Sequence, residues 1–331
     1  MSTNCLKPTT SSIRWGIIGC GKVTEVKSGP AYQKTNDFKL DAVMRRNLAR
    51  AKDYADRHGV DKYTDNANAI INDDNIDAIY IATPPDSHLH YALQVAEAGK
   101  ICCIEKPLSP TYQESLSIVN AFEAKNLPLF VAYYRRSLPR FNKVKTLLSA
   151  NEIGKIRHVS WHLSKPANDL DLSGDYNWRT DKNIALGGYF DDLASHGLDL
   201  FAYLLGDYQQ VKGIALNQQA LYSAFDAVSA CWQHKNGITG TGSWNFGGNA
   251  RHDHVTIYGS EGEISFSVFD DRAITLKKAA TSQEIYIHNP ENIQLFHVNN
   301  MREQLVNNRP HPSTGITALH TSWVMEEILR N

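Results

Sequence analysis

Short apolar runs alternate with longer amphipathic segments in the first part of the chain. The segments between the runs have helical length, and Asp86 or Ser87 after Pro84-Pro85 is expected to cap one of them. This order predicts an α/β fold with a doubly wound, mostly parallel sheet, in which ligands bind beyond the carboxyl ends of the strands. The expected strands are IRWGII from Ile13, FKLDAVM (38–44), DAIYIAT (77–83), ICCI (101–104) and LPLFVAYYRR (127–136), and the helices include NLARAKDYADRHG, DSHLHYALQVAEAGK and TYQESLSIVNAFEAKN (111–126).

The pattern changes beyond about residue 130, where polar and apolar positions alternate in strand-length segments separated by turn residues. This alternation predicts a large, mostly antiparallel open sheet, polar or ligand-facing on one side and covered by helices on the other. One helical segment interrupts it, GGYFDDLASHGLDLFAYLLG (187–206). The expected strands are RHVSWHLS (157–164), VKGIALNQQA (211–220), AVSACWQHK (227–235), ITGTGSWNF (238–246), HVTIYGS (254–260) and GEISFSVF (262–269).

Length and composition indicate a two-domain globular protein with a small-molecule partner. The chain has 331 residues and a formal net charge of −1, and it contains no basic run with interleaved aromatic residues, which argues against nucleic acid or a membrane surface as partner. The polar start MSTNCLKPTTSSIR lacks the apolar stretch of a secretory signal, and no later window has the length of a membrane span. We therefore expect a disordered leader over residues 1–12 of a cytoplasmic protein. The five cysteines show neither metal-ligand nor C-x-x-C spacing, which predicts reduced thiols and no metal site.

A glycine pair follows the first expected strand. Gly19 and Gly21 would let the backbone turn sharply and approach a pyrophosphate, whose charge is favoured at the start of the next helix. The third small position of such a fingerprint holds Thr24, and a plain strand–helix turn is the alternative interpretation. The residues expected to hold the pyrophosphate are Gly19, Cys20, Gly21, Lys22 and Val23.

Two arginines, Arg45 and Arg46, stand at the end of the second strand, where a site for NAD usually has an acidic residue. Guanidinium groups there can bind a 2′-phosphate in a bidentate manner. The sequence therefore favours NADP as cofactor, with NAD possible. The alternative is that the two arginines only begin a solvated helix.

Polar residues also end the later strands. Thr83 and Pro84 follow one strand, and Glu105 and Lys106 follow another, before Pro107 forbids continuation in mid-sheet. Because the carboxyl ends of parallel strands share one edge, we expect all of these groups to line the ligand edge of the sheet. By itself, a charged strand end is more typical of solvated surface.

The ordered set of motifs resembles the glucose–fructose oxidoreductase, inositol dehydrogenase and rhizopine-catabolism family (Gfo/Idh/MocA) of NAD(P)-dependent oxidoreductases. The segments that carry the resemblance are WGIIGCGKV, IATPPDSHLHYALQVAEAGK, EKPLS and GGYFDDLASHGLDL, and together they span most of the chain.

The resemblance implies a Rossmann domain, placed here at residues 13–130, followed by an α/β domain at 131–331 whose open sheet commonly forms homodimers or homotetramers. It implies oxidation or reduction of a carbon in a sugar, a cyclitol or a related polyol or keto-sugar. It places the lysine of the EKP motif, Lys106, at the reaction centre, and it gives the aspartate and histidine of the D-x-x-x-H segment, Asp192 and His196, contact with substrate.

Hydride removal from a carbinol carbon requires a base for the hydroxyl proton and a cation near the developing negative oxygen. His196 is expected to be the general acid/base because histidine titrates in the useful range, with Lys106 polarising the oxygen and sharing in the proton relay. Asp192 would orient His196 or bind a neighbouring hydroxyl. The reverse assignment, with Lys106 as the main base, stays open, and an Asp–His pair four residues apart is by itself more typical of a helix surface.

Further candidates come from the remaining family motifs. Trp178, Arg179, His88 and Glu105 are expected at the cofactor, and Arg135 at the substrate; the family often has Asn-Arg-Arg where this chain has Tyr134-Arg135-Arg136. Each also has a structural interpretation, such as a core tryptophan or a histidine that caps a helix. Two other functions are compatible with the fold: a nucleotide-sensing regulator, disfavoured because both Lys106 and His196 are present, and a glycosidase that uses bound NAD transiently.

Overall fold

The computed structural model describes residues 12–330, so Cys5 and nearly all of the predicted leader lie outside the described residues. The chain forms two compact units, the first made of residues 1–109, 113–137 and 290–318, and the second of residues 110–112, 138–289 and 319–331. The predicted boundary near residue 130 assigned the whole later chain to the second domain. The structure differs because the segment 290–318 returns to the first unit.

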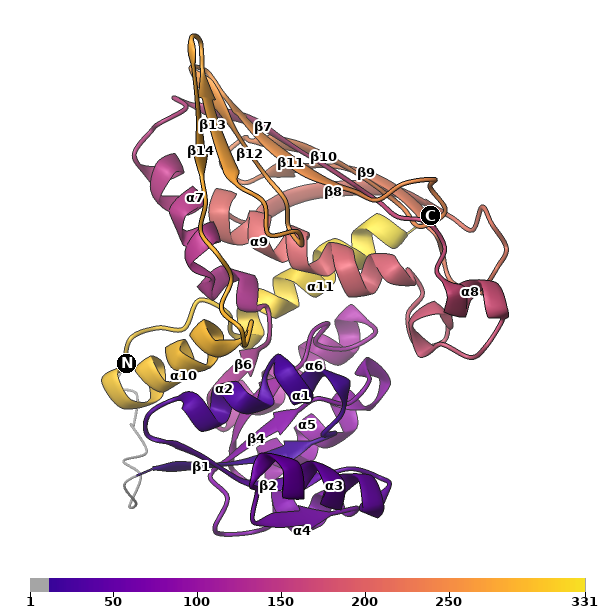
Figure 1. Ribbon diagram of the computed structural model, residues 1–331, viewed down its shortest axis with the longest axis vertical. Coiled ribbons are helices and arrows are strands. Elements are labelled where there is room, and N and C mark those ends of the chain that lie inside the picture. The colour runs from indigo at the N-terminus through magenta and orange to yellow at the C-terminus, as the bar shows by residue number, and fades with distance from the viewer. Residues whose placement is uncertain (1–11, 331) are drawn as a thin grey trace. The chain divides into compact units, whose positions relative to one another are not determined.

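The first unit is built on a parallel sheet with the strand order β3-β2-β1-β4-β5-β6 (Figure 1). The change of direction between β1 and β4 creates the crevice in which such sheets bind dinucleotides. The order confirms the predicted doubly wound sheet, and only β3 was not expected. The strands are β1 (Ile13–Ile18), β2 (Phe38–Met44), β3 (Lys62–Thr64), β4 (Ala78–Ile81), β5 (Ile101–Ile104) and β6 (Leu129–Val131).

Side-chain caps start two of the helices of this unit, α3 and α4 (Ala67–Ile71), among the described residues. In α3 (Leu48–His58), the Asn47 side chain accepts a hydrogen bond from the Arg50 N–H at 3.0 Å, and Gly59 ends the helix at φ 63°. Ser87 precedes α5 as predicted, but its side chain makes no capping bond there. The other helices are α1 (Lys22–Val26), α2 (Gly29–Lys34), α4 (Ala67–Ile71), α5 (His88–Glu97), α6 (Tyr112–Ala124) and α10 (Leu295–Asn307), with 3-10 turns at Pro85–Ser87 and Tyr134–Ser137.

The sixth strand is shorter than its sequence suggested. The apolar run continues to Tyr134, but the strand ends at Val131 and a 3-10 turn follows. The returning segment explains the change, because the Ser313 hydroxyl donates to the Val131 carbonyl at 2.7 Å and the Arg136 guanidinium donates to the Pro312 carbonyl at 3.1 Å. Such long-range partners are invisible in the local pattern.

The second unit contains an eight-stranded sheet in the order β14-β13-β12-β11-β7-β10-β9-β8. All neighbouring strands are antiparallel except β7 and β10, which run parallel. This confirms the predicted mostly antiparallel sheet. The strands are β7 (Ile156–Ser164), β8 (Tyr208–Leu216), β9 (Ala227–His234), β10 (Thr239–Asn245), β11 (His252–Gly259), β12 (Gly262–Phe266), β13 (Ile274–Lys278) and β14 (Thr281–Ile285).

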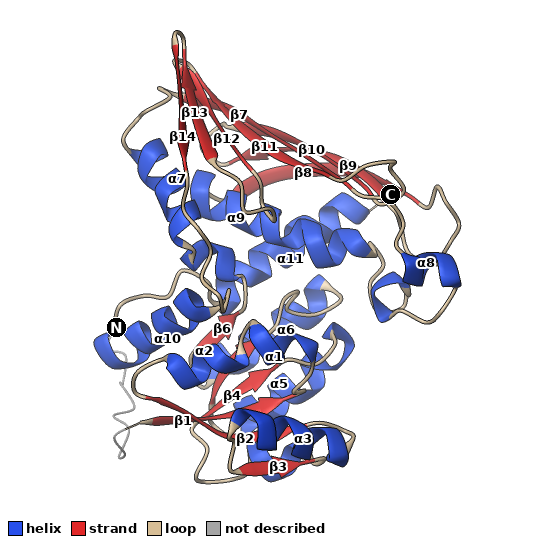
Figure 2. Ribbon diagram, in the orientation of Figure 1, coloured by secondary structure: helices blue, strands red, loops and turns tan. Residues whose placement is uncertain are grey.

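One face of this sheet carries helices (Figure 2). Gly197 of α9 lies so close to β7 that a Cβ there would come within 2.3 Å of the Trp161 ring, so glycine lets helix and sheet approach. The helices of this unit are α7 (Pro139–Ser149), α8 (Asp169–Ser173), α9 (Ser195–Leu205) and the later part of α11 (Gly315–Leu329), with a 3-10 turn at Trp178–Thr180. Within residues 12–330, no helix is long and apolar enough to cross a membrane.

The predicted helix over 187–206 has two parts. Its first turn, Phe190–Ala194, is a π-helix, and the α-helix α9 begins only at Ser195. Asp192 therefore belongs to the wider π-turn and His196 to the α-helix. Such π-turns are frequent at functional sites.

Candidate active site

The glycine loop after β1 is tightly constrained. Gly19 has φ +95°, and a Cβ at this position would come within 2.7 Å of the Thr83 Cγ2 and 2.9 Å of the Ala82 carbonyl carbon. The N–H groups of Gly19 and Cys20 both donate to the Met44 carbonyl, at 2.9 and 3.0 Å. These two residues thus join the ends of β1, β2 and β4, and their amides are already used.

The next three amides are the ones left for an anion. No hydrogen bond from Gly21, Lys22 or Val23 N–H to another described residue occurs, and Gly21 immediately precedes α1. A Cβ built on Gly21 meets nothing nearer than the Gly19 carbonyl oxygen at 3.7 Å, so the space above it is open. The loop therefore fits a pyrophosphate, with Gly21 to Val23 as donors and Gly19 and Cys20 as its support.

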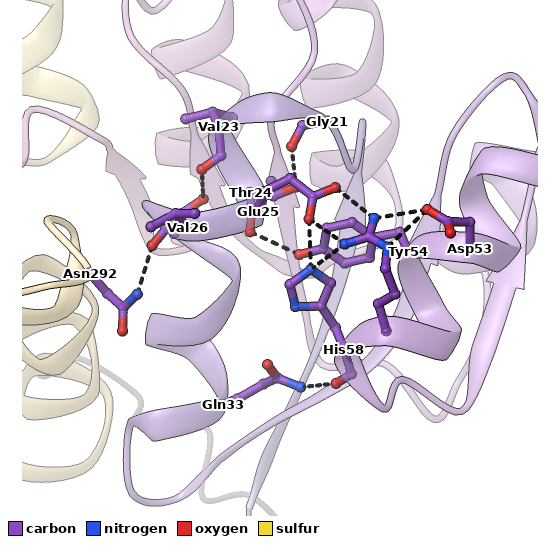
Figure 3. Close-up of polar contacts among 12 residues, drawn as sticks. Gly21, Val23, Thr24, Glu25, Val26, Gln33, Asp53, Tyr54, His58 and Asn292 are labelled. Carbon is purple, nitrogen blue, oxygen red and sulfur yellow. Dashed lines mark hydrogen bonds and ion pairs between the residues drawn. The ribbon is translucent and has the colours of Figure 1, made fainter.

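Helix α1 is fixed from several sides (Figure 3). The Thr24 hydroxyl, at the position where a fingerprint glycine was missing, donates to the Gly21 carbonyl at 2.9 Å, and the Tyr54 hydroxyl donates to the Thr24 carbonyl at 2.9 Å. Glu25 pairs with Arg57 at 2.8 Å and with His58 at 2.8 Å. Hydrogen bonds from Arg57 and His58 lower the pKa of Glu25 to about 2.

The two arginines after β2 stand where sequence analysis expected them. Arg45 is partly exposed and Arg46 exposed, and neither guanidinium makes a hydrogen bond or ion pair with another residue in 12–330. The side chain of the next residue, Asn47, is occupied as the N-cap of α3. The end of β2 therefore presents two available cations and no carboxylate, which suits a phosphate.

His88 links the ends of β4 and β5. It is fully buried, with one ring nitrogen 2.9 Å from the Thr83 carbonyl oxygen and the other 3.1 Å from that of Pro107. Burial lowers the pKa of His88, while the backbone carbonyls that face its ring oppose this shift. This geometry gives His88 a structural role at the sheet edge, holding Thr83 and Pro84 beside the Lys106–Pro107 peptide, which is cis.

Glu105 is the buried anchor of the EKP motif. Its carboxylate accepts hydrogen bonds from the Tyr80 hydroxyl at 2.5 Å, the Gln294 amide at 2.7 Å and the Lys106 N–H at 3.2 Å. Burial and the neighbouring Glu105 charge raise the pKa of Tyr80, which stays a donor. Lys106 itself is partly exposed at the ligand edge.

The second unit holds the other predicted polar group. Arg179 Nε donates to Asp192 Oδ2 at 3.0 Å, and the Arg179 guanidinium lies 4.3 Å from the centroid of the Trp178 ring. His196 is buried on α9, with its ring edge-on to Phe269 at a centroid distance of 5.9 Å. The structure therefore brings Trp178, Arg179 and Asp192 together, a connection that the separate motifs did not reveal.

The candidate residues are divided between the units. Arg135 lies in the first unit, buried, with its guanidinium 4.9 Å from the Tyr134 ring centroid. No group of three or more His, Cys, Asp or Glu side chains in residues 12–330 could hold a metal ion. The first unit contains Gly19, Cys20, Gly21, Lys22, Val23, Arg45, Arg46, Thr83, Pro84, His88, Glu105, Lys106 and Arg135, and the second Trp178, Arg179, Asp192 and His196.

Sequence reasoning missed three residues that the structure places at these groups. Tyr80 and Gln294 bind Glu105, but the first looks like an ordinary strand residue and the second lies far along the chain. Lys165 follows β7 directly and lies over the Tyr189 ring. The rule that chemistry gathers at strand ends, already applied to the first sheet, could have singled out Lys165.

Comparison with family models covers most of the chain. Residues 13–133 match the oxidoreductase family with an NAD-binding Rossmann fold, and residues 141–265 match the GFO/IDH/MocA C-terminal domain. The chain is 41% identical to Oxidoreductase P35 of Formosa agariphila over 86% of its own length and 88% of that protein. It is 29% identical to levoglucosan dehydrogenase of Pseudarthrobacter phenanthrenivorans over 68% of this chain and 64% of that enzyme.

Solved structures show the same fold. Levoglucosan dehydrogenase in complex with NADH superimposes with a TM-score of 0.87 at 21% identity, covering 96% of both chains. An oxidoreductase from Thermotoga maritima gives a TM-score of 0.84 at 21% identity, again over 96% of both chains. With its glycine loop, its two sheets and matches over both halves, the chain belongs to the Gfo/Idh/MocA family of NAD-binding oxidoreductases.

Proposed function

We propose that this oxidoreductase transfers hydride between NADP and a carbinol or keto carbon of a sugar, cyclitol or related polyol. The single observation that carries the proposal is the environment of Lys106. It follows a strand at the same sheet edge as the glycine loop, and its neighbour Glu105 is fixed by three hydrogen-bond donors. Relatives named as sugar or polyol dehydrogenases, including scyllo-inositol 2-dehydrogenase of Bacillus subtilis, support the substrate class.

The preference for NADP over NAD is supported by Arg45 and Arg46. A 2′-phosphate bound after β2 would supply the acceptors that both guanidinium groups lack among the described residues. Gly21 to Val23 would hold the pyrophosphate, and Thr83 and Pro84 would lie beside the bound cofactor. When bound, the nicotinamide accepts or returns the hydride.

The proton chemistry is assigned to side chains of the protein. In the oxidative direction, the substrate hydroxyl gives its proton to His196 as the carbon loses hydride, and the Lys106 ammonium stabilises the negative oxygen. Asp192, held by Arg179, binds a neighbouring hydroxyl or orients His196. Arg135 is retained as a candidate substrate contact.

The test is a screen of nicotinamide absorbance with NADP and NAD against a panel of sugars, inositols and keto-sugars. We expect turnover of at least one of them and a lower KM for NADP than for NAD. Tight binding of cofactor without turnover of any member would favour a regulator, and product formation without change in nicotinamide absorbance would favour a redox-neutral enzyme.

The open face of the second sheet is the proposed surface for homodimer or homotetramer formation. It exposes Ile214, Leu216 and Tyr258, with 64%, 51% and 40% of their surface accessible. Light scattering of the purified protein tests this proposal, and a monomer at micromolar concentration would contradict it.

A further inference from the structure

Lys165 occupies the carboxyl end of the parallel strand pair in the second sheet. It follows Ser164, the last residue of β7, and its N–H donates to the Asn245 carbonyl at 3.0 Å at the end of β10. Since β7 and β10 run parallel, their carboxyl ends coincide, and Lys165 extends beyond them. This is the kind of position at which parallel strands present groups to ligands.

The ammonium of Lys165 rests on aromatic rings and is not paired with a carboxylate. Its Nζ lies 3.6 Å from the Tyr189 ring centroid and 5.9 Å from that of Phe246. Within residues 12–330 the ammonium itself makes no hydrogen bond and no ion pair. Burial lowers the pKa of Lys165, while the charges of Asp171 and Asp192 oppose this shift. A partly buried ammonium has three N–H donors, and a ring face engages them only weakly.

Tyr189 is a rigid support for this lysine. Its hydroxyl donates to Asp171 Oδ1 at 2.6 Å and accepts from the side-chain amides of Asn168 at 2.8 Å and Asn177 at 3.1 Å. The ring therefore cannot turn away without breaking three hydrogen bonds. Asp171 accepts from the Tyr189 hydroxyl through Oδ1 and from the Asn168 N–H through Oδ2, at 3.3 Å.

The other charged groups nearby already have partners at contact distance. Arg179 pairs with Asp192 at 3.0 Å, and Arg251 pairs with Asp270 at 2.8 Å. Among these three cations, only Lys165 has no carboxylate of the described residues at hydrogen-bond distance. A ligand carboxylate would provide both the opposite charge and the acceptor oxygens that the ring faces lack.

We propose that Lys165 binds a carboxylate on the substrate, so that the enzyme acts on sugar acids such as hexuronates or aldonates in preference to neutral sugars. The proposal rests on the proposed function, because Asp192 is assigned to the same substrate. Lys165 selects the substrate by charge and takes no part in proton transfer.

Pairs of a neutral sugar and the corresponding sugar acid test the proposed carboxylate site. D-glucose is compared with D-glucuronate and D-galactose with D-galacturonate, using wild type, Lys165→Met, Lys165→Arg and the control Lys235→Met, an exposed lysine that pairs with Asp207. For each acid we expect Lys165→Met to raise KM about 10-fold or more, since a charge-assisted hydrogen bond is lost. Lys165→Arg should keep most of the preference for acids, and Lys235→Met should behave as wild type.

Calorimetric binding of glucuronate and of glucose to the NADPH-saturated protein gives a second readout that does not require turnover. Weaker glucuronate binding in Lys165→Met, with no sugar oxidised by any variant, would support the carboxylate site while the proposed oxidoreduction of sugars failed. A wild type that prefers the neutral sugars, or a Lys165→Met variant that changes both members of each pair equally, would overturn the carboxylate site. Absence of measurable glucuronate binding to wild type would also overturn it.

Discussion

The two sheets of this protein bury their strands in opposite ways. In the first sheet, β4, β5 and β6 are buried at every position, because helices cover both faces. In the second, β10 alternates between buried and accessible positions, with Gly240, Gly242 and Trp244 inward and Thr239 and Thr241 outward. The first sheet is therefore covered on both faces, whereas the second is covered on one face and open on the other.

This difference decides where each unit can carry chemistry. A strand buried on both faces has no free side chains along its length, so polar function is confined to its ends, as at Gly19, Arg45 and Lys106. The half-open sheet can carry polar side chains along its face, yet its candidate substrate residues also cluster at one strand end and one helix start, at Lys165 and Asp192.

The largest expected effect follows loss of the proposed proton-transfer residues, one in each unit. Lys106→Met and His196→Asn should each lower kcat by about 10²- to 10⁴-fold, because general acid–base catalysis contributes that much. Cofactor binding, measured by fluorescence titration, should stay within a few-fold of wild type. Lys125→Met, which removes an exposed lysine paired with Glu97, is the control and should retain full turnover. Near wild-type kcat in either variant would remove that residue from the mechanism.

The next effect concerns the strand-end cations of the first unit. Replacing both Arg45 and Arg46 by alanine should raise the Kd of NADPH about 10- to 100-fold, since charge-assisted hydrogen bonds to the 2′-phosphate are lost. The Kd of NADH should hardly change, and Arg50→Ala on the exposed side of α3 serves as a control for the loss of a nearby surface arginine. An equal increase in the Kd of NADPH and of NADH would mean that Arg45 and Arg46 do not bind the 2′-phosphate.

Acid should destabilise both units through their buried histidines. Burial lowers the pKa of His311 in the first unit and of His234 in the second to about 4. Because unfolded histidine takes up a proton near pH 6.5, the unfolded state binds more protons between about pH 6.5 and 4, and stability falls as pH falls through that window. At pH 5 the loss should be about 2 kcal/mol for each histidine.

Urea unfolding of wild type and His234→Gln at pH 7 and pH 5 measures this effect. The loss of unfolding free energy between pH 7 and pH 5 should be about 2 kcal/mol smaller in the variant than in wild type, since glutamine does not titrate. Hydrogen exchange should show that the second unit of the variant has become less sensitive to acid, while the first unit keeps its acid sensitivity. An unchanged pH dependence in the variant would show that His234 is not held neutral in the folded protein.

The smallest effect belongs to the ion pairs around α1. Glu25→Gln should lower the free energy of unfolding by only about 1 kcal/mol, because the pairs with Arg57 and His58 are partly solvated. Since the pKa of Glu25 is lowered, this contribution is present above about pH 4.5 and is lost as pH falls toward 2. Glu291→Gln, which removes a far more exposed pair with Lys34, should change stability less. Equal effects would show that the α1 network is no stronger than a surface pair.

The sequence was sufficient for most strands and for the fold class, because apolar periodicity is a local property. FKLDAVM and ICCI matched their strands residue for residue, and the predicted helix NLARAKDYADRHG corresponds to α3 with its two caps, Asn47 and Gly59. The EKP motif also placed Lys106 at the ligand edge, through the rule that parallel strands end together. The pattern did not show that Tyr134 leaves the sheet, or that Asp192 lies in a π-turn, since both depend on distant packing.

What the sequence determined, then, is the order of buried and exposed segments and the chemical types at their ends. Tertiary structure decided which of those types meet. Gln294 binds Glu105 across 189 residues of sequence, Arg179 pairs with the Asp192 carboxylate, and the Tyr189 ring supports the Lys165 ammonium. Hydrogen bonds and charges act over a few ångströms in space whatever the separation along the chain, so only the folded backbone determines which partners they find.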